Sequence, residues 1–377
     1  MEERVRFILA CRDADESFAA ICASFGISRK TGYKWLERFD ARGMGGLADR
    51  SRVPAIHPRW LTDAAVDAII EARKRHPTWG PKKLQTVLLE SRPELAKVGI
   101  STIAGVLKRY GLVRTTRRRP RIVRYSEPLG ACVAPNDVWC ADFKGHFALL
   151  DRSRCHPLTI SDAASRFLLK CEGLQMTDEA HVRVHFERAF VEYGLPSRIR
   201  TDNGPPFASR APAGLSKLAI WWVQLGIIPE RIQPGHPEQN GRHERMHRTL
   251  GEETTRPPGR NLRAQQRLFD LFRKQYNEHR PHEALGQKPP ASVYTPSRRP
   301  LPTSLGGHPE YAPDQIVRMV DDRGRIRWQM ARVLVSPLLA GQPIGARCVA
   351  DGRWELRYGP LVLGILDERR KEPRLVA

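Results

Sequence analysis

The sequence predicts a multidomain protein in which α-helical units precede an α/β domain and a small β-barrel. Helical spacing interrupted by glycine turns dominates the first hundred or so residues. Strand-like runs then alternate with amphipathic helices to about residue 298, and short alternating segments separated by tight turns follow Pro300. With 377 residues, the chain is long enough for several domains that each have their own core.

The composition indicates the class of partner and the compartment. A net charge of +22 favours a polyanionic partner such as nucleic acid, although ribosomal and membrane-surface proteins share this property. The seven cysteines form no C-x-x-C pair, and their odd number and scatter are typical of free thiols in a reducing cytoplasm. We find no signal peptide and no apolar run near the roughly 18 residues that a membrane span needs, so we expect a cytoplasmic protein without a membrane partner.

Residues 1–56 have the pattern of a helix-turn-helix DNA-binding domain. Residues 17–25 have helical spacing, Gly26 breaks the helix, and Ser28 can cap a basic helix over residues 29–39. In this motif the second helix enters the major groove. Three cations on it are candidate DNA contacts: Arg29, Lys30 and Lys34. The alternative is an ordinary helical hairpin with a core of three aromatic residues: Tyr33, Trp35 and Phe39.

Residues 57–125 are interpreted as a second helical DNA-binding unit followed by a basic linker. Amphipathic helices are expected over residues 61–74, 82–89 and 102–110, and Gly111 ends the last of them. An arginine-rich run follows, which is either a solvated linker or a segment that follows DNA phosphates. We favour phosphate contact, with these residues as candidates: Lys108, Arg109, Arg117, Arg118 and Arg119.

Residues 130–298 are expected to form an α/β domain with a mixed sheet. Strand-like runs at residues 139–143, 145–150, 156–162 and 166–171 precede a helix over residues 178–193. A strand ending at Asp202, a helix over 215–225 and a strand over 227–232 come next. A meander of strands followed by alternating helices and strands favours strands of both directions in one sheet.

Acidic residues lie at three places in this domain that could converge on one site. Asp142 and Asp202 each end a predicted strand, and a helix beginning near Glu238 carries a further carboxylate at Glu244. Burying an unpaired charge costs too much free energy, so such aspartates need a partner. Mg²⁺ prefers carboxylate oxygens and shares them with substrate phosphates. A pair of such ions roughly 3.5–4 Å apart activates an attacking oxygen and stabilises a leaving one.

Three ordered motifs then carry a resemblance to a known family: Trp139-x-x-Asp142; Thr201-Asp202-Asn203-Gly204 with Phe207; and Pro237-x-x-Asn240-Gly241-x-x-Glu244-Arg245. Together they resemble the signatures of the retroviral-integrase superfamily, in particular those of bacterial insertion-sequence transposases with a DDE catalytic triad. The resemblance extends from Asp137 to Tyr294, and the segment from Tyr276 to Pro290 resembles the part that closes such cores. It implies a ribonuclease-H-like catalytic core whose triad holds two divalent metal ions.

The resemblance implies a DNA transposase that cuts the ends of a mobile element and joins them to target DNA. Asp142, Asp202 and Glu244 would be both the catalytic residues and the ligands of Mg²⁺ or Mn²⁺. Further candidate DNA contacts close to the metal ions are Asn203, Gln239, Asn240 and Arg245. The implied partner is double-stranded DNA, from the element ends and the target. The implied state is a homodimer or larger assembly on the DNA of a bacterial nucleoid.

The choice of glutamate rests on the motif rather than on spacing. Glu238 is separated from Asp202 by 35 residues, the familiar spacing of retroviral relatives, and Glu244 is separated from it by 41. Asn240-Gly241-x-x-Glu244 keeps the Gly-x-x-Glu of the family, and the added length matches an insertion around residues 209–214. A carboxylate at Glu238 is also explained by its place in the first turn of a helix. We therefore assign Glu244.

Other interpretations use the same residues. His243-Glu244-Arg245-Met246-His247 matches the H-E-x-x-H helix of zinc proteases, but that interpretation explains neither aspartate, and we expect both histidines to approach phosphates or to lie on the solvent face. Asp142 and Asp202 could be turn residues, and Asp137 and Asp162 are nearby alternatives. A catalytically inactive DNA-binding regulator derived from a transposase would need only the helical units.

Residues 305–370 are expected to form the small β-barrel. Short alternating segments are separated by Arg-Gly, Asp-Gly and Gly-Pro turns. Four arginines make DNA contact plausible, although a dimer contact or a packing cap would look the same: Arg318, Arg325, Arg327 and Arg332. The resemblance to transposases implies such a C-terminal barrel.

Overall fold

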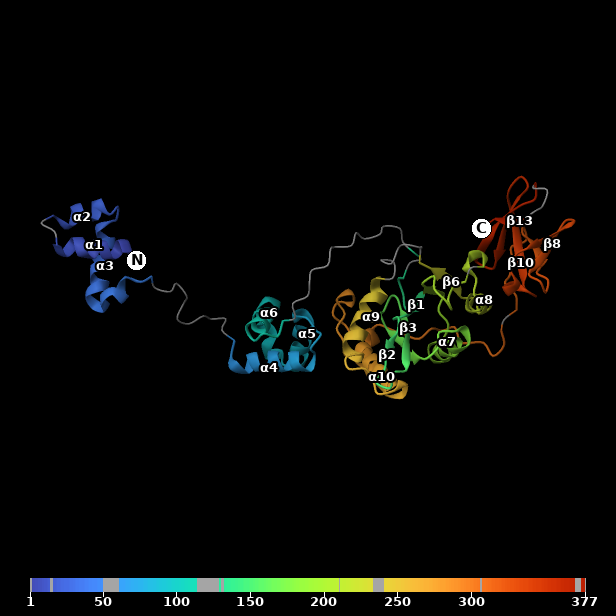
Figure 1. Ribbon diagram of the computed structural model, residues 1–377, viewed down its shortest axis with the longest axis horizontal. Helices are drawn as coiled ribbons and strands as arrows, with labels where there is room; N and C mark the ends of the chain where they lie inside the picture. The colour runs from blue at the N-terminus through green and yellow to red at the C-terminus, as the bar shows by residue number, and fades with distance from the viewer. Residues whose placement is uncertain are drawn as a thin grey trace. The chain divides into compact units, whose positions relative to one another are not determined.

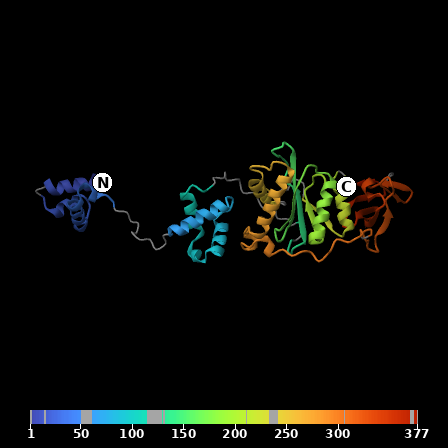
Figure 2. The ribbon, with the colours of Figure 1, turned by 90° about the horizontal axis from the view of Figure 1, so that it is seen from below.

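The computed structural model describes residues 2–13, 16–49, 61–113, 129, 132–209, 211–232, 241–305, 307–369 and 374–376. The chain divides into two compact units, Met1–Asp63 and Ala64–Ala377 (Figures 1 and 2). Within these ranges, no helix is both long and apolar enough to cross a membrane.

The first unit is a small helical domain. Its helices are α1 (Glu2–Asp13), α2 (Phe18–Ser24), α3 (Arg29–Arg42) and the 3-10 helix η1 (Gly43–Leu47). Ser17 and Ser28 cap α2 and α3, because each hydroxyl accepts a hydrogen bond from the amide three residues later. Phe7, Ile21 and Cys22 lie in the buried core. The two predicted helices and the predicted cap at Ser28 are therefore confirmed.

The second unit begins with another group of helices. These are α4 (Asp63–Arg75), α5 (Pro81–Ser91), the 3-10 helix η2 (Pro93–Lys97) and α6 (Ile100–Arg109). One apolar side of each helix is buried, as Ile69, Leu84 and Ile103 show. Gly111 follows α6 with a φ of +67°, a conformation that favours glycine. The three predicted helices are present with shifts of one or two residues at their ends.

A mixed sheet forms the centre of the second unit. Its strands are β1 (Val138–Phe143), β2 (Phe147–Ala148), β3 (Arg154–Asp162), β4 (Leu168–Leu174), β5 (Arg198–Thr201) and β6 (Ile228–Arg231). β3 pairs antiparallel with both β1 and β4, whereas β1–β5 and β5–β6 are parallel pairs. The short strand β2 pairs with the beginning of β3. This is the mixed sheet that the sequence predicts for an α/β domain.

Helices cover both faces of this sheet. One face carries α7 (Glu179–Tyr193) and α8 (Lys217–Gln224), and the other carries α9 (Gly241–Thr254) and α10 (Leu262–Glu278) (Figures 1 and 2). Leu158 and Ile160 of β3 pack in the cluster that contains α7 and α8. Because side chains alternate along a strand, Thr159 between them points to the α9 face.

The end of α10 and the segment after it close the core, as the resemblance of residues 276–290 to integrase-type proteins suggests. The buried side chain of Asn277 accepts a hydrogen bond from the Leu168 amide at 2.8 Å and donates one to the Leu168 carbonyl at 3.0 Å. Arg280 pairs with Glu253 of α9 at 2.8 Å. The 3-10 helices η5 (Glu283–Leu285) and η6 (Pro290–Ser292) complete the segment. These contacts join α9, α10 and the edge strand β4.

The last part is β-rich, but it is not the closed barrel that we expected. A five-stranded sheet has the order β13 (Arg374–Val376), β12 (Leu361–Asp367), β11 (Arg353–Tyr358), β10 (Pro343–Ala350) and β7 (Ile316–Met319). A separate hairpin joins β8 (Arg325–Trp328) and β9 (Ala331–Leu334), and the 3-10 helix η7 (Pro337–Leu339) follows it. Among the strands described, β7 and β13 are open edges. The predicted barrel is therefore replaced by an open sheet.

The apolar face of this open sheet packs against other elements instead of closing on itself. Ile326 and Val333 of the hairpin share one buried cluster with Ile344 and Leu356 of the sheet. Leu215, Ile220 and Val223, in and beside α8, belong to the same cluster, which we call the α8–sheet cluster. The loop predicted to be an insertion forms the 3-10 helix η3 (Pro212–Gly214), whose Ala213 packs against this cluster.

Candidate active site

The strand register places Asp142 and Asp202 beside each other. Ala141 of β1 pairs with Thr201 of the parallel strand β5, and an aspartate follows each of them. Neighbouring strands lie about 4.8 Å apart, and residues at the same level of a parallel pair point to the same face. The two carboxylates therefore project from adjacent positions on one face of the sheet. This pairing is the geometric core of the candidate site.

Asp202 begins a tight turn immediately after β5. The Gly204 amide donates a hydrogen bond to Asp202 Oδ1 at 3.2 Å. Burial raises the pKa of Asp202, and this hydrogen bond opposes the rise. No ion pair to Asp202 is formed within the described ranges. The turn expected from its sequence is present, and it holds a half-buried carboxylate at the end of the strand.

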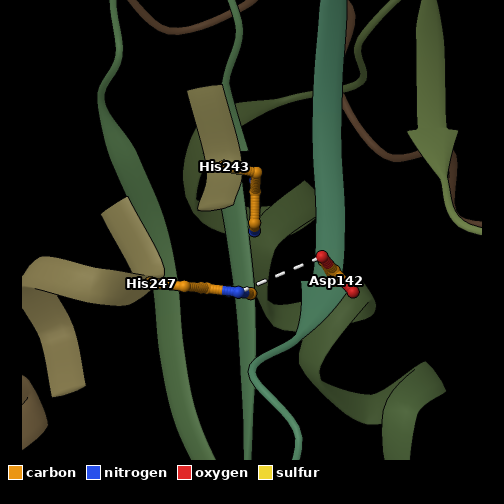
Figure 3. Close-up of side chains that lie close together, drawn as sticks. All are labelled: Asp142, His243 and His247. Carbon is orange, nitrogen blue, oxygen red and sulfur yellow. Dashed lines mark ion pairs between the residues drawn. The ribbon is translucent and has the colours of Figure 1, made fainter. Parts of the chain in front are cut away.

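Asp142 shares its face of the sheet with two histidines of α9 (Figure 3). Its cross-strand partner on β3 is Thr159, whose side chain is completely buried. Thr159 Oγ1 lies 2.6 Å from His243 Nε2, 2.7 Å from His247 Nε2 and 3.1 Å from the Asp142 carbonyl oxygen. His247 Nδ1 is 4.0 Å from Asp142 Oδ2. We call these four residues the Thr159 cluster.

Both histidines are buried, which corrects the expectation that they lie on the solvent face or approach phosphates. Only 3% of His243 and 9% of His247 are exposed. Burial lowers the pKa of His243 to about 3 and that of His247 to about 2, so both rings are neutral at physiological pH. Potential ligand atoms of Asp142, His243 and His247 lie within 4.8 Å of one another. Neutral imidazoles beside a carboxylate form a possible metal-binding group.

The sequence contained a signal for this burial that our reasoning missed. Met246 and Leu250, predicted to share one helix face, both pack in the buried cluster between α9, α10 and β4. His243 and His247 lie three residues before each of them and continue the same stripe. The spacing alone therefore placed the histidines toward the sheet.

Glu244 lies in the first turn of α9, beside the buried His243. Its side chain is exposed, and no hydrogen bond or ion pair of the described residues joins it to Asp142 or Asp202. The structure thus brings the two aspartates and the histidines together and leaves Glu244 at the rim. The competing Glu238 lies outside the described residues, as do Gln239 and Asn240.

The two alternative aspartates have structural roles. Asp137 accepts hydrogen bonds from the amides of Val133 and Ala134. Asp162, almost fully buried, accepts one from the Asn136 amide and two from Ser165. Trp139 is also buried, and its indole donates to Asn136 Oδ1 at 3.0 Å. These residues hold β1 and the turn after β3, so both aspartates have structural partners.

The candidate DNA contacts that the structure describes are exposed: Arg29, Lys30, Lys34, Lys108, Arg109, Asn203 and Arg245. Asn203 donates a hydrogen bond to the Ile232 carbonyl, which orders its turn. In α3, Trp35 packs on Phe7, but Tyr33 is 62% exposed and so is not the core residue that the alternative interpretation required. Arg117, Arg118 and Arg119 lie outside the described residues.

Comparison with known proteins agrees with this architecture. Two family models described as "Integrase core domain" match residues 133–237 and 225–290. A "Helix-turn-helix domain" model matches residues 3–55, and a "Homeodomain-like domain" model matches residues 31–107. The chain is 31% identical over 250 residues to the insertion element IS476 uncharacterized 39.2 kDa protein of Xanthomonas euvesicatoria, covering 66% of this chain and 69% of that protein. The chain belongs to the insertion-element transposases with an integrase core.

Other similarities of this transposase are more partial. It is 31% identical over 180 residues to the insertion element IS407 uncharacterized 31.7 kDa protein of Burkholderia multivorans, covering 48% of this chain and 62% of that protein. Among solved structures, the HTLV-2 integrase catalytic core domain in complex with magnesium covers 44% of the transposase and 99% of its own chain, at 16% identity and a TM-score of 0.35. Family membership also leaves the zinc-protease interpretation of the H-E-x-x-H match without support.

Proposed function

We propose that this transposase cuts DNA at the ends of its element and joins the freed ends to target DNA, with Asp142, Asp202 and Glu244 as the catalytic residues. The observation that carries the proposal is the pairing of Ala141 with Thr201, because it sets two carboxylates side by side at the ends of parallel strands. Phosphoryl transfer needs this kind of constellation, in which positioned negative ligands hold divalent cations against the phosphate.

The donor set fits divalent metal ions. Asp142 and Asp202 supply hard carboxylate oxygens, and burial raises the pKa of Asp202, which a cation beside it would lower again. Integrase cores as a family depend on divalent metal, and we propose Mg²⁺, with Mn²⁺ as a substitute. Two such ions would activate the attacking oxygen and neutralise charge on the leaving one.

Glu244 of α9 would be the third carboxylate of the proposed metal-binding set. His243 contacts Thr159, the strand partner of Asp142, and so fixes the first turn of α9 over the end of β1. Glu244 is the next residue and is exposed at this rim, where its carboxylate can share an ion with Asp142 once DNA is bound. The family motif Gly-x-x-Glu supports this choice over Glu238.

The remaining assignments concern DNA. We propose that the exposed cations of α3 and α6 bind the element ends, and that Asn203, Gln239, Asn240 and Arg245 contact DNA beside the metal ions. The domains would be residues 1–56, 57–125, 130–298 and 305–370, with the last acting as a further contact surface. Because two ends must be cut and joined together, the working form would be a homodimer or larger assembly on double-stranded DNA.

The test is Mg²⁺-dependent cleavage and joining on DNA that carries the ends of the element. Asp142→Asn, Asp202→Asn and Glu244→Gln should abolish both steps while end binding persists, and Glu238→Gln should retain activity. Loss in Glu238→Gln with retention in Glu244→Gln would reverse our choice of glutamate. Tight binding without cleavage by the wild type would refute the catalytic proposal and favour a DNA-binding regulator.

A further inference from the structure

Hydrogen-bond accounting in the Thr159 cluster determines which nitrogen of each histidine carries its proton. A threonine hydroxyl has one proton to donate and two lone pairs to accept with. The Asp142 carbonyl can only accept, so its 3.1 Å contact with Thr159 Oγ1 uses the single proton. The hydroxyl must then accept at its 2.6 Å and 2.7 Å contacts. Both histidines therefore carry their proton on Nε2.

The two histidines differ at the other ring nitrogen. His243 Nδ1 lies 3.3 Å from the Ser161 hydroxyl, which can donate to it. His247 Nδ1 makes no hydrogen bond within the described part of the chain and faces Asp142 Oδ2 at 4.0 Å. That separation is too long for a hydrogen bond. A nitrogen lone pair thus faces a carboxylate oxygen, an arrangement that a cation held between the two atoms would stabilise.

The separation matches a bridging metal ion. Metal bonds to imidazole nitrogen and carboxylate oxygen are each about 2.0–2.2 Å long, so two ligand atoms of one ion lie roughly 2.8–4.4 Å apart, depending on the angle at the ion, and the 4.0 Å between Nδ1 and Oδ2 lies within this range. The side chains of His247 and Asp142 are 11% and 15% exposed, so their shared edge is open enough for an ion to enter. The contact with Thr159 also fixes the ring orientation, as partners of metal-bound histidines commonly do.

We propose that His247 Nδ1 is a direct ligand of the divalent ion held by Asp142. A nitrogen ligand favours Mn²⁺, Co²⁺ and Zn²⁺ over Mg²⁺, which prefers oxygen. His243 instead positions the helix, because both of its nitrogens are already engaged. The inference rests on Asp142 being a metal ligand, as in the proposed function, but the two can fail separately.

The decisive experiment is pulsed electron paramagnetic resonance of the full-length protein with one equivalent of Mn²⁺, without DNA. Nitrogen hyperfine coupling is expected in the wild type and in His243→Gln, and its loss is expected in His247→Gln. The two glutamines form a matched pair, because each keeps an N–H donor that can reach Thr159 while removing Nδ1. Calorimetry should show Mn²⁺ affinity reduced at least about tenfold in His247→Gln, with Mg²⁺ affinity much less affected.

Further variants make each outcome informative. Asp142→Asn should remove this Mn²⁺ binding, which locates the ion. His247→Asn, a second replacement in case the glutamine does not fold, should bind Mn²⁺ without nitrogen coupling. Coupling that persists in His247→Gln, or disappears in His243→Gln, would overturn the inference. Mn²⁺ binding that depends on Asp142 but shows no coupling in the wild type would overturn it and leave the proposed function intact. Absence of Mn²⁺ binding would overturn the inference, whereas the proposed function is decided separately by cleavage and joining on DNA that carries the element ends.

Discussion

Replacing Thr159 with valine tests whether its hydroxyl holds α9 against the sheet. Valine has nearly the same shape, so Thr159→Val opens no cavity and removes only the hydroxyl. The Nε2–H donors of His243 and His247 then lose their acceptor in a site where both rings are buried. An unsatisfied buried donor costs about 1–3 kcal/mol, so the loss for the two donors should lower the local free energy of opening by roughly 2–6 kcal/mol.

Hydrogen exchange measured by mass spectrometry can read this change locally, without assuming that a multidomain chain unfolds in one step. Peptides from β1, β3 and α9 should exchange at least about thirtyfold faster in Thr159→Val, and up to about ten-thousandfold faster, since each 1.4 kcal/mol corresponds to a factor of ten. Thr159→Ser is the matched control, because it keeps the hydroxyl and loses one methyl group, at a cost near 1 kcal/mol. If the valine variant exchanges no faster than the serine variant, the hydroxyl does not hold the helix.

The remaining predictions concern other parts of the chain. Asn277→Leu leaves the Leu168 amide and carbonyl unpaired and should destabilise the core by about 2–4 kcal/mol. The measurement is the melting temperature, with Asn203→Leu as the exposed control. Equal decreases in melting temperature for the two variants would show that Asn277 does not hold β4. Burial lowers the pKa of His282 to about 3, so the unfolded chain takes up a proton below pH 6.5 while the folded chain does not until about pH 3. Acidification from pH 7 to pH 5 should therefore lower the free energy of unfolding by up to about 2 kcal/mol more in the wild type than in His282→Phe. Equal decreases in the two proteins would contradict the burial of a neutral His282. Lys34→Gln should reduce the salt-dependence slope of DNA binding by about one, and Arg6→Gln on α1 should leave the slope unchanged.

The sequence predicted the order of elements and the strand-end aspartates because both depend on local patterns. Short strand-like runs identified β1 and β5, and a strand that ends in aspartate identified Asp142 and Asp202 as candidate ligands. The register Ala141–Thr201 was not readable, because pairing depends on which strands become neighbours and by how much they are shifted. The resemblance supplied what local patterns could not, namely that these two strands meet.

The histidines and the expected barrel show two different limits of prediction from the sequence. His243 and His247 were placed in solvent because histidine was treated as polar, although their spacing with Met246 marked the buried stripe. Alternation along residues 343–367 correctly indicated strands, but alternation does not say whether the first and last strands of a sheet pair. Here β7 and β13 do not pair, and α8 contributes to the cover of the apolar face.

The α8–sheet cluster has a consequence for shortened copies of this transposase. A copy that ended near residue 298 would keep every candidate catalytic carboxylate but would lose the cover over Ile220 and Val223. These side chains would form an exposed hydrophobic patch on α8, of the kind that drives self-association. Such a fragment is expected to precipitate or be degraded instead of competing with the intact enzyme for element ends. The open sheet would then protect the element from interference by its own truncated products.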